Sequence, residues 1–247
     1  MMAGTLTSLG ELEAAKGHFT AALDLYDERS PQRSVFGSDL GVFAHAWYAH
    51  NLFLLGDPDA AQSEAEGAIA LARRLDHPYS LALALAYGAL THQLRDDVAR
   101  VSAHAEEAVR LCDRCGFAYY DDWVRVLAGW ARGRQGDPAS GIALIERGLQ
   151  GLESRRARTR RPYYLSLLAE TLIAAGRAGA AAAAIDDAVA IALAHGDRWW
   201  LPELLRQKAL LLPGVAGDPL LRQALDAARQ QRSTSLEHRI LASQPAS

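Results

Sequence analysis

Cysteine and lysine are scarce in this chain of 247 residues, which contains two cysteines and has Lys16 and Lys208 as its only lysines. Two cysteines cannot form a disulfide framework, so a cytoplasmic protein is expected. A phosphate-binding loop needs a Gly-Lys pair before Ser or Thr, because the lysine and the backbone N–H groups hold the phosphates together. Ala15 and Gln207 precede the two lysines, so the chain has no such loop.

Long apolar runs and an excess of basic residues are also missing. No stretch approaches about 18 consecutive apolar residues, and Met1–Gly10 lacks the basic start and apolar middle of a secretory signal. We therefore expect no contact with a membrane. Lys and Arg together number 26 against 29 Asp and Glu, which gives a formal net charge of -3. Dedicated nucleic-acid binders are basic, so direct binding of nucleic acid is not expected.

Catalytic and metal-binding motifs are absent as well. The chain has neither the Gly-x-Ser-x-Gly turn of a hydrolase nucleophile nor the His-Glu pair of helical zinc proteases. Cys112 and Cys115 form a single Cys-x-x-Cys, without the second pair or the histidines that complete a zinc tetrahedron. Both continue the apolar face of a helix expected at 97–115, so we interpret them as core thiols. The sequence thus predicts no metal site, no cofactor and no enzyme.

What the sequence does contain is a repeat. The tripeptide Gly-Asp-Pro begins at Gly56, Gly136 and Gly217, with spacings of 80 and 81 residues. Glycine can adopt the left-handed conformation just after a helix, aspartate can cap the next helix, and proline fits its first position. Each copy therefore predicts a tight turn between two helices.

Two further turns, near 96 and 176, lie halfway between these copies and reduce the period to 40 residues. Tyr79, Tyr119 and Trp199 each follow a turn by 23 residues, whereas Tyr163 follows its turn by 27. The extra residues amount to about one helical turn and fall in the arginine-rich stretch 154–161. A period of about 40 residues over four units is typical of a solenoid.

Apolar residues within each unit follow helical spacing, and no alternating β-type run is present. The sequence predicts an all-α chain in a single domain, 1–247, with repeat turns near 10, 56, 96, 136, 176 and 217 and a loop at 30–37. The expected helices span 11–27, 38–55, 58–75, 79–94, 97–115, 118–134, 138–153, 162–175, 178–194, 198–212, 218–231 and 233–243.

Four segments give the chain a resemblance to a known family: LGDPDAA at 55–61, HPYSLA at 77–82, RPYYLSLLAE at 161–170 and SLEHR at 235–239. Together they resemble the C-terminal tetratricopeptide-like (TPR-like) region of bacterial multidomain signalling proteins that carry a class III adenylate or guanylate cyclase and a predicted ATPase. Related repeats end the large transcription-activating signal-transduction ATPases. The likeness covers about residues 9–243, and repeats near 40 residues are a longer variant of the roughly 34-residue TPR unit. It implies a right-handed α-solenoid of antiparallel helix pairs.

The resemblance further implies a non-catalytic regulatory module that binds a protein or peptide partner in the concave groove, where the first helix of each pair lies. An assembly scaffold for oligomerisation and a sensor of a small effector are the alternatives. The repeat template places seven residues on the concave surface: His50, Trp123, Trp130, Tyr163, Glu170, Glu203 and Arg206.

The chain has one basic run, which consists of Arg155, Arg156, Arg158, Arg160 and Arg161. An exposed loop between two helices is one interpretation of this run. The other is a patch that binds a phosphate or an acidic partner, because guanidinium groups bind such anions through two parallel hydrogen bonds.

The first repeat unit is expected to be incomplete. Met1–Leu9 is too short for a full first helix, whereas 11–27 predicts a complete second one. A solenoid needs polar caps on its end units, because each unit buries its apolar side against a neighbour. Either the chain is the tail of a longer protein, as the resemblance favours, or its N-terminal end forms a homo-oligomer.

Overall fold

The computed structural model describes residues 2–30 and 37–244; it is 80% helical and has no strand in those ranges. The predicted all-α repeat fold is confirmed. The described helices are α1 (Met2–Leu9), α2 (Leu12–Asp24), α3 (Leu40–Leu55), α4 (Pro58–Arg74), α5 (Pro78–Leu94), α6 (Val98–Cys115), α7 (Ala118–Arg134), α8 (Pro138–Ser154), α9 (Arg161–Ala174), α10 (Ala178–His195), α11 (Leu201–Leu210), the short 3₁₀ helix η1 (Gly214–Gly217), α12 (Asp218–Gln230) and α13 (Thr234–Leu241).

Helix α1 precedes the first helix on the expected list and has eight residues, which agrees with the expectation that this segment is too short for a full first helix. Ala3, Gly4 and Thr7 are its buried residues, and α1 packs against α2. Gly4 faces the ring of Trp47, and a Cβ at this position would lie 3.4 Å from the ring, an ordinary van der Waals contact between α1 and α3. The predicted loop at 30–37 can be compared only at its two ends, because 31–36 lie outside the described residues.

Two of the three Gly-Asp-Pro turns have the predicted mechanics. Gly56 has a φ of 98°, and Asp57 Oδ1 accepts a hydrogen bond of 3.0 Å from the backbone N–H of Ala60. Pro58 is then the first residue of α4. The turn at Gly136, with a φ of 96°, repeats this geometry at the start of α8. Both turns satisfy backbone groups that a helix end leaves without a partner.

The third copy differs, which corrects the prediction of a tight turn at Gly217. Its φ is -79°, it lies in η1, and Asp218 is the first residue of α12 instead of its cap. A Cβ at Gly217 would lie 2.4 Å from the carbonyl oxygen of Ala209, so this close approach requires glycine. The residue serves the packing against α11 and does not form a left-handed turn.

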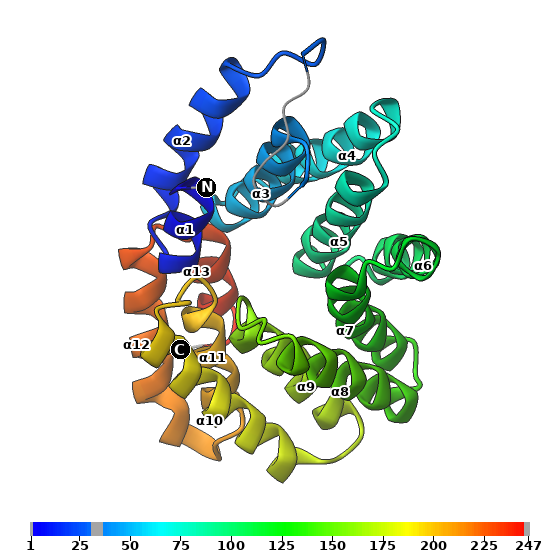
Figure 1. Cartoon of the computed structure of the whole chain (residues 1–247). Helices are drawn as coiled ribbons and strands as arrows, with labels where there is room; N and C mark the ends of the chain where they lie inside the picture. The colour runs from blue at the N-terminus through cyan, green and yellow to red at the C-terminus, as the bar shows by residue number, and fades with distance from the viewer. Residues whose placement is uncertain (1, 31–36, 245–247) are drawn as a thin grey trace.

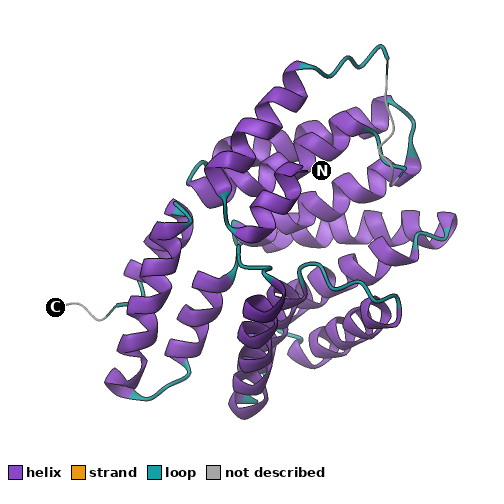
Figure 2. Ribbon diagram, turned by 60° about the vertical axis from the view of Figure 1, so that its left-hand side comes forward, coloured by secondary structure: helices purple, strands orange, loops and turns teal. Residues whose placement is uncertain are grey.

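The helix pairs form two layers around a curved solenoid (Figure 1). The first helices of the pairs, α3, α5, α7, α9 and α11, contact one another in order and form the inner layer. Helix α5 is buried along most of its length, whereas the outer helix α6 buries one face only. One continuous hydrophobic cluster extends from Leu12 to Ile240. Figure 2 shows that short turns join the helices.

The solenoid curls until its last helix, α13, meets the first inner helix, α3 (Figure 1). Helix α13 packs against α3, and the Ser233 hydroxyl donates a hydrogen bond of 3.1 Å to the carbonyl oxygen of Leu54. On the α1 side, the backbone N–H of Arg198 donates to the carbonyl oxygen of Ser8 at 2.7 Å. The concave side is therefore narrow, and most of its side chains are buried.

Helix α10 is the one described helix that is long and apolar enough to cross a membrane, by length and composition alone. Asp186 and Asp187 interrupt its middle, and Asp186 Oδ1 lies 2.6 Å from Nζ of Lys208 on α11. The apolar character of α10 comes mainly from alanine, which lets it pack closely against α9 and α11 as the outer helix of a repeat.

The two cysteines of α6 have different environments. Cys112 is buried, as predicted, but Cys115 is exposed, which corrects the expectation of two core thiols. The apolar face ends before Cys115 because this residue closes the helix, and the chain turns away at Gly116 with a φ of 72°.

Candidate binding site in the concave interior

A row of aromatic side chains lines the concave interior. Trp47 of α3 and Tyr87 of α5 lie 5.2 Å apart between ring centroids, and Tyr87 lies 5.0 Å from Trp123 of α7. The row continues at Tyr163 of α9, whose ring lies 5.2 Å from that of Trp199. Successive units thus place their rings in contact, although Tyr87 and Trp123, and Tyr163 and Trp199, are 36 residues apart, about one helical turn less than the repeat period.

Trp47 and Tyr87 are two residues of this row that the sequence prediction did not include. Tyr87 is buried, and Trp47 is partly buried and packs against the main hydrophobic cluster. They are separated by one repeat period of 40 residues. A search for aromatic residues at that period from Tyr87 would have found Trp47.

Three of the seven predicted groove residues, His50, Trp123 and Tyr163, belong to the aromatic row. The imidazole of His50 meets the ring of Trp199 edge-on, 4.2 Å between centroids. Both His50 nitrogens are buried, and neither has a hydrogen-bond partner among the described residues. Burial, and then the positive charge of Arg160, lowers the pKa of His50 well below its ordinary value, so the ring is neutral.

The other four predicted residues, Trp130, Glu170, Glu203 and Arg206, are joined in one hydrogen-bond network. Trp130 Nε1 donates to Glu170 Oε2 at 2.8 Å, and Gln207 Nε2 donates to the other Glu170 oxygen at 2.8 Å. Gln207 also donates to Glu203 Oε1 at 3.2 Å, and Arg206 binds both Glu203 oxygens at 2.8 and 2.6 Å. Burial raises the pKa of the Glu170 carboxyl above its ordinary value.

These seven residues expose little surface. Glu170 and Arg206 are the two that are partly exposed. The remaining five are at most 1% exposed: His50, Trp123, Trp130, Tyr163 and Glu203. The accessible edge of the network is therefore formed by Glu170 and Arg206, together with Arg239 of α13, whose Nη1 lies 3.8 Å from Glu203 Oε1.

The arginine run does not form one surface. Arg155 Nε donates to Asp122 Oδ2 at 2.8 Å, and Arg161 Nη1 lies 2.8 Å from Glu153 Oε2. Arg156 and Arg158 are exposed in the loop between α8 and α9. The remaining member, Arg160, turns inward and is 2% exposed.

Arg160 lies inside a cage of three aromatic rings. Its guanidinium carbon lies 4.2, 4.8 and 4.9 Å from the ring centroids of Trp47, Tyr87 and Trp123, respectively. Its backbone N–H donates to Asp197 Oδ2 at 2.7 Å and so ties the α8–α9 loop to the segment before α11. Burial lowers the pKa of Arg160 from its ordinary value, because desolvation outweighs the attraction of neighbouring groups. Sequence pattern alone treats Arg160 like the other four arginines of the run.

A hollow of about 340 Å³ lies beside this guanidinium on the inner side of α3, α5 and α7. We call it the aromatic chamber. Its lining consists of Ser38, Phe43, Trp47, Tyr79, Leu83, Tyr87, Tyr119, Tyr120, Trp123, Thr159 and Arg160.

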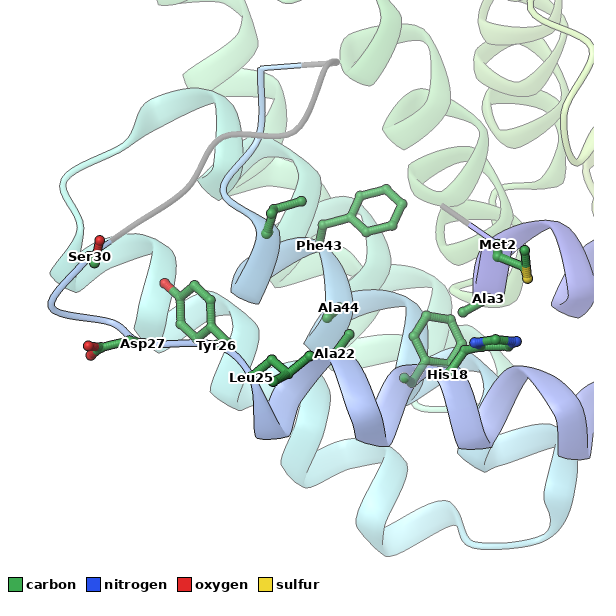
Figure 3. Close-up of a pocket in the computed structure, with 12 residues that line it drawn as sticks. Met2, Ala3, His18, Ala22, Leu25, Tyr26, Asp27, Ser30, Phe43 and Ala44 are labelled. Atoms are coloured by element: carbon green, nitrogen blue, oxygen red, sulfur yellow. The ribbon is translucent and has the colours of Figure 1, made fainter.

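A second hollow, of about 380 Å³, lies outside the interior between α1, α2 and α3 (Figure 3). Met2 and Leu25, which line it, are 63% and 87% exposed. We call it the N-terminal hollow. In the described parts of the chain, no group of three His, Cys, Asp or Glu side chains gathers as a metal site.

No protein-family model matches the chain. In sequence it is 29% identical over 242 residues to the uncharacterized protein R02095 of Rhizobium meliloti (strain 1021). The match covers 94% of this chain and 23% of that protein, so this chain spans about a quarter of the length of that relative.

Solved structures with TPR repeats share the fold. Aspartyl phosphate phosphatase F from Bacillus subtilis matches with a TM-score of 0.58 at 12% identity, over 98% of this chain and 68% of its own. The Cut9-Hcn1 hetero-tetramer of the APC/C matches with a TM-score of 0.57 at 14% identity, over 94% of this chain and 40% of the matched chain. A third match is the Signal Transduction ATPase with Numerous Domains from Pyrococcus horikoshii, which has a tetratricopeptide repeat sensor. Its TM-score is 0.52 at 12% identity, over 89% of this chain and 32% of the matched chain. The chain is therefore an all-α TPR-like solenoid.

Proposed function

We propose that the chain is a non-catalytic interaction module of a bacterial, cytoplasmic signalling system and that it binds a protein or peptide partner on its concave side. The observation that carries this proposal is the inner layer, which gathers aromatic and charged side chains around a hollow. Binding surfaces combine aromatic anchors with a few polar groups in this way. The system would be of the cyclase–ATPase or transcription-regulator type, as the segments at 55–61 and 161–170 indicate by their resemblance.

One of the proteins with the same fold is a signalling protein by name, the signal-transduction ATPase with a repeat sensor. This name supports a regulatory role by analogy only, because the likeness itself extends to the fold. The regulatory proposal therefore depends on the inner surface of this chain.

The partner would contact the accessible edge of the interior. Tyr119 lines the aromatic chamber and is partly exposed. Arg206 and Glu170 form the accessible part of the polar network, and Arg239 places its guanidinium carbon 5.6 Å from the ring centroid of Trp200. Charged groups at such an edge would orient a partner, and the rings would hold its apolar side chains.

The proposal is tested by replacing Tyr119 with the photo-cross-linking residue p-benzoylphenylalanine in native cells. The matched control carries the same residue at Arg110, which is 65% exposed on the outer helix α6. We expect a discrete adduct at Tyr119 and none at Arg110. The cross-linked protein, once identified and purified, should bind the chain in calorimetry at least fivefold more weakly after Arg206→Ala. Equal adducts at both positions, or no adduct at Tyr119, would contradict binding on the concave side.

An assembly scaffold is the second candidate, and the N-terminal hollow favours it. Met2 and Leu25 expose large apolar side chains at the same hollow, and such grouped apolar surface is typical of an interface. A second copy of the chain that covers this hollow would give a homo-oligomer joined through the N-terminal helices.

A further inference from the structure

The guanidinium of Arg160 carries a buried positive charge that no carboxylate contacts at ion-pair distance within the described ranges. Its side chain donates a hydrogen bond to the Tyr87 hydroxyl, and Tyr164 and Asp197 attract the charge electrostatically. Asp197, the carboxylate tied to this loop, accepts from the backbone N–H of Arg160 instead. The three rings of the cage offset part of the desolvation of the cation, since their faces attract positive charge. A buried charge without an anionic partner nevertheless remains unfavourable.

Two hydrogen-bond donors at the cage are also without an acceptor. Arg160 Nε and the indole Nε1 of Trp123 are buried and lack a partner among the described residues. Buried polar groups are nearly always hydrogen-bonded, so such a group of donors needs an explanation. Nε of arginine and Nε1 of tryptophan can only donate, so what they lack is an acceptor.

The aromatic chamber beside these donors has the size and lining of a small-ligand site. Its volume of about 340 Å³ lies within the roughly 300–1,000 Å³ range of ligand pockets. Seven of its lining residues are aromatic, and Arg160 is the one Lys, Arg, Asp or Glu side chain in its lining. The chamber therefore combines flat apolar walls with a single positive charge.

We infer that the aromatic chamber binds a small organic anion, namely a carboxylate or phosphate group on a flat apolar body. The anionic group accepts hydrogen bonds from Arg160 and lies against the donor Trp123, which also lines the chamber. Its flat body packs between the rings of Tyr79 and Tyr119 at the partly exposed side of the chamber. A cation is excluded, because Arg160 repels it. This ligand site goes beyond the proposed binding of a protein partner and does not depend on it.

The test uses naphthalene-2-carboxylate and its neutral isostere 2-naphthamide as probes, titrated into the full chain by calorimetry. The carboxylate should bind at least tenfold more tightly than the amide, because only the carboxylate pairs with the charge of Arg160. Arg160→Gln should weaken the carboxylate at least tenfold, which is about 1.4 kcal/mol, and change the amide less than twofold. Arg158→Gln, at an exposed position in the same loop, is the matched control and should leave both affinities unchanged.

The position of the probe is checked by the indole N–H signals in ¹H–¹⁵N spectra. The carboxylate should shift the signal of Trp123, assigned with Trp123→Phe, while the signal of Trp130 stays in place. Equal affinity for the two probes, no binding of either at 5 mM, or carboxylate binding that Arg160→Gln leaves intact would overturn the inference. If Arg160→Gln does not fold, the comparison of the two probes on the unmodified chain decides alone. None of these results depends on the cross-linking at Tyr119, so the two proposals can fail separately.

Discussion

Ser233 and Leu54 are 179 positions apart in the sequence, and the hydroxyl of Ser233 donates a hydrogen bond of 3.1 Å to the carbonyl oxygen of Leu54. Nearby, the Ser235 hydroxyl donates to the carbonyl oxygen of Phe53 at 2.6 Å. Both acceptors lie in the last turn of α3, where carbonyls need partners from outside the helix, and the Phe53 carbonyl also accepts from the backbone N–H of Gly56 at 3.1 Å. The contact therefore satisfies the end of the first inner helix with the last helix of the chain and closes the ring.

Closure of the ring predicts that the double variant Ser233→Ala, Ser235→Ala loses stability. Loss of the Ser233 bond removes the side-chain partner of the Leu54 carbonyl, at a cost of about 1–3 kcal/mol where that group stays buried, whereas the Phe53 carbonyl keeps the backbone N–H of Gly56 at 3.1 Å and loses less. We expect a loss of about 2 kcal/mol in total, measured by urea unfolding. Ser154→Ala, whose exposed hydroxyl bonds only within its own helix, is the control and should change the free energy by less than about 0.5 kcal/mol. A double variant as stable as this control would mean that the ring contact contributes nothing.

The buried ion pair of Glu203 and Arg206 predicts a larger effect. Glu203 is fully buried, so Glu203→Ala leaves the arginine without its carboxylate and should cost about 3 kcal/mol. The double variant Glu203→Leu, Arg206→Met should recover part of this loss, because it removes both charges. Glu107→Ala, which breaks an exposed pair with Arg73, should cost less than about 1 kcal/mol. Unfolding in guanidinium chloride would contradict the prediction if the Glu203 and Glu107 variants lost equal stability.

The buried histidines predict that stability falls in mild acid. Burial and the neighbouring His104 lower the pKa of His92 to about 4, and burial also lowers the pKa of His50. Because these folded-state pKa values lie below the unfolded value near 6.5, the unfolded chain binds more protons as the pH falls. Stability is then full above about pH 6.5 and decreases below it, by up to about 1.4 kcal/mol per pH unit for each histidine.

Urea unfolding at pH 7.5 and pH 5.0 measures this effect. Arg100 opposes the protonation of His92, whereas Asp97 and Glu66 favour it. His92→Gln should reduce the difference between the two pH values by about 2 kcal/mol, and His18→Gln, at an exposed position, should leave it unchanged. Equal differences in both variants would show that His92 does not control the loss.

The N-terminal hollow predicts self-association and fast amide exchange in residues 2–27. Leu25→Asp should reduce dimer formation at least tenfold in sedimentation velocity, since Leu25 is 87% exposed beside the hollow. Leu193→Asp removes a half-exposed leucine from α10 and should leave assembly unchanged. A monodisperse monomer at high concentration with slow exchange in this region would rule out the scaffold and show a self-sufficient first unit.

Helix positions were predictable because the signals that set them are local. The helix expected at 118–134 is α7 with the same bounds, and the turns at Gly56 and Gly136 have the predicted caps. The repeat template grouped Trp130, Glu170, Glu203 and Arg206, but only the structure shows that Trp130 pairs with Glu170 and Glu203 with Arg206. Gly217 shows the limit, since the same tripeptide forms a different turn where α12 packs closely on α11.

The sequence by itself determined the all-α repeat fold. Helix caps and turn glycines act within a few neighbouring residues, and their recurrence about every 40 residues indicates the repeat. Only the tertiary structure decided that Arg160 enters an aromatic cage while Arg158 stays exposed. It also decided that the ring closes at Ser233. The curvature of a solenoid is the sum of small rotations between repeats, and contacts between residues 179 positions apart depend on that sum.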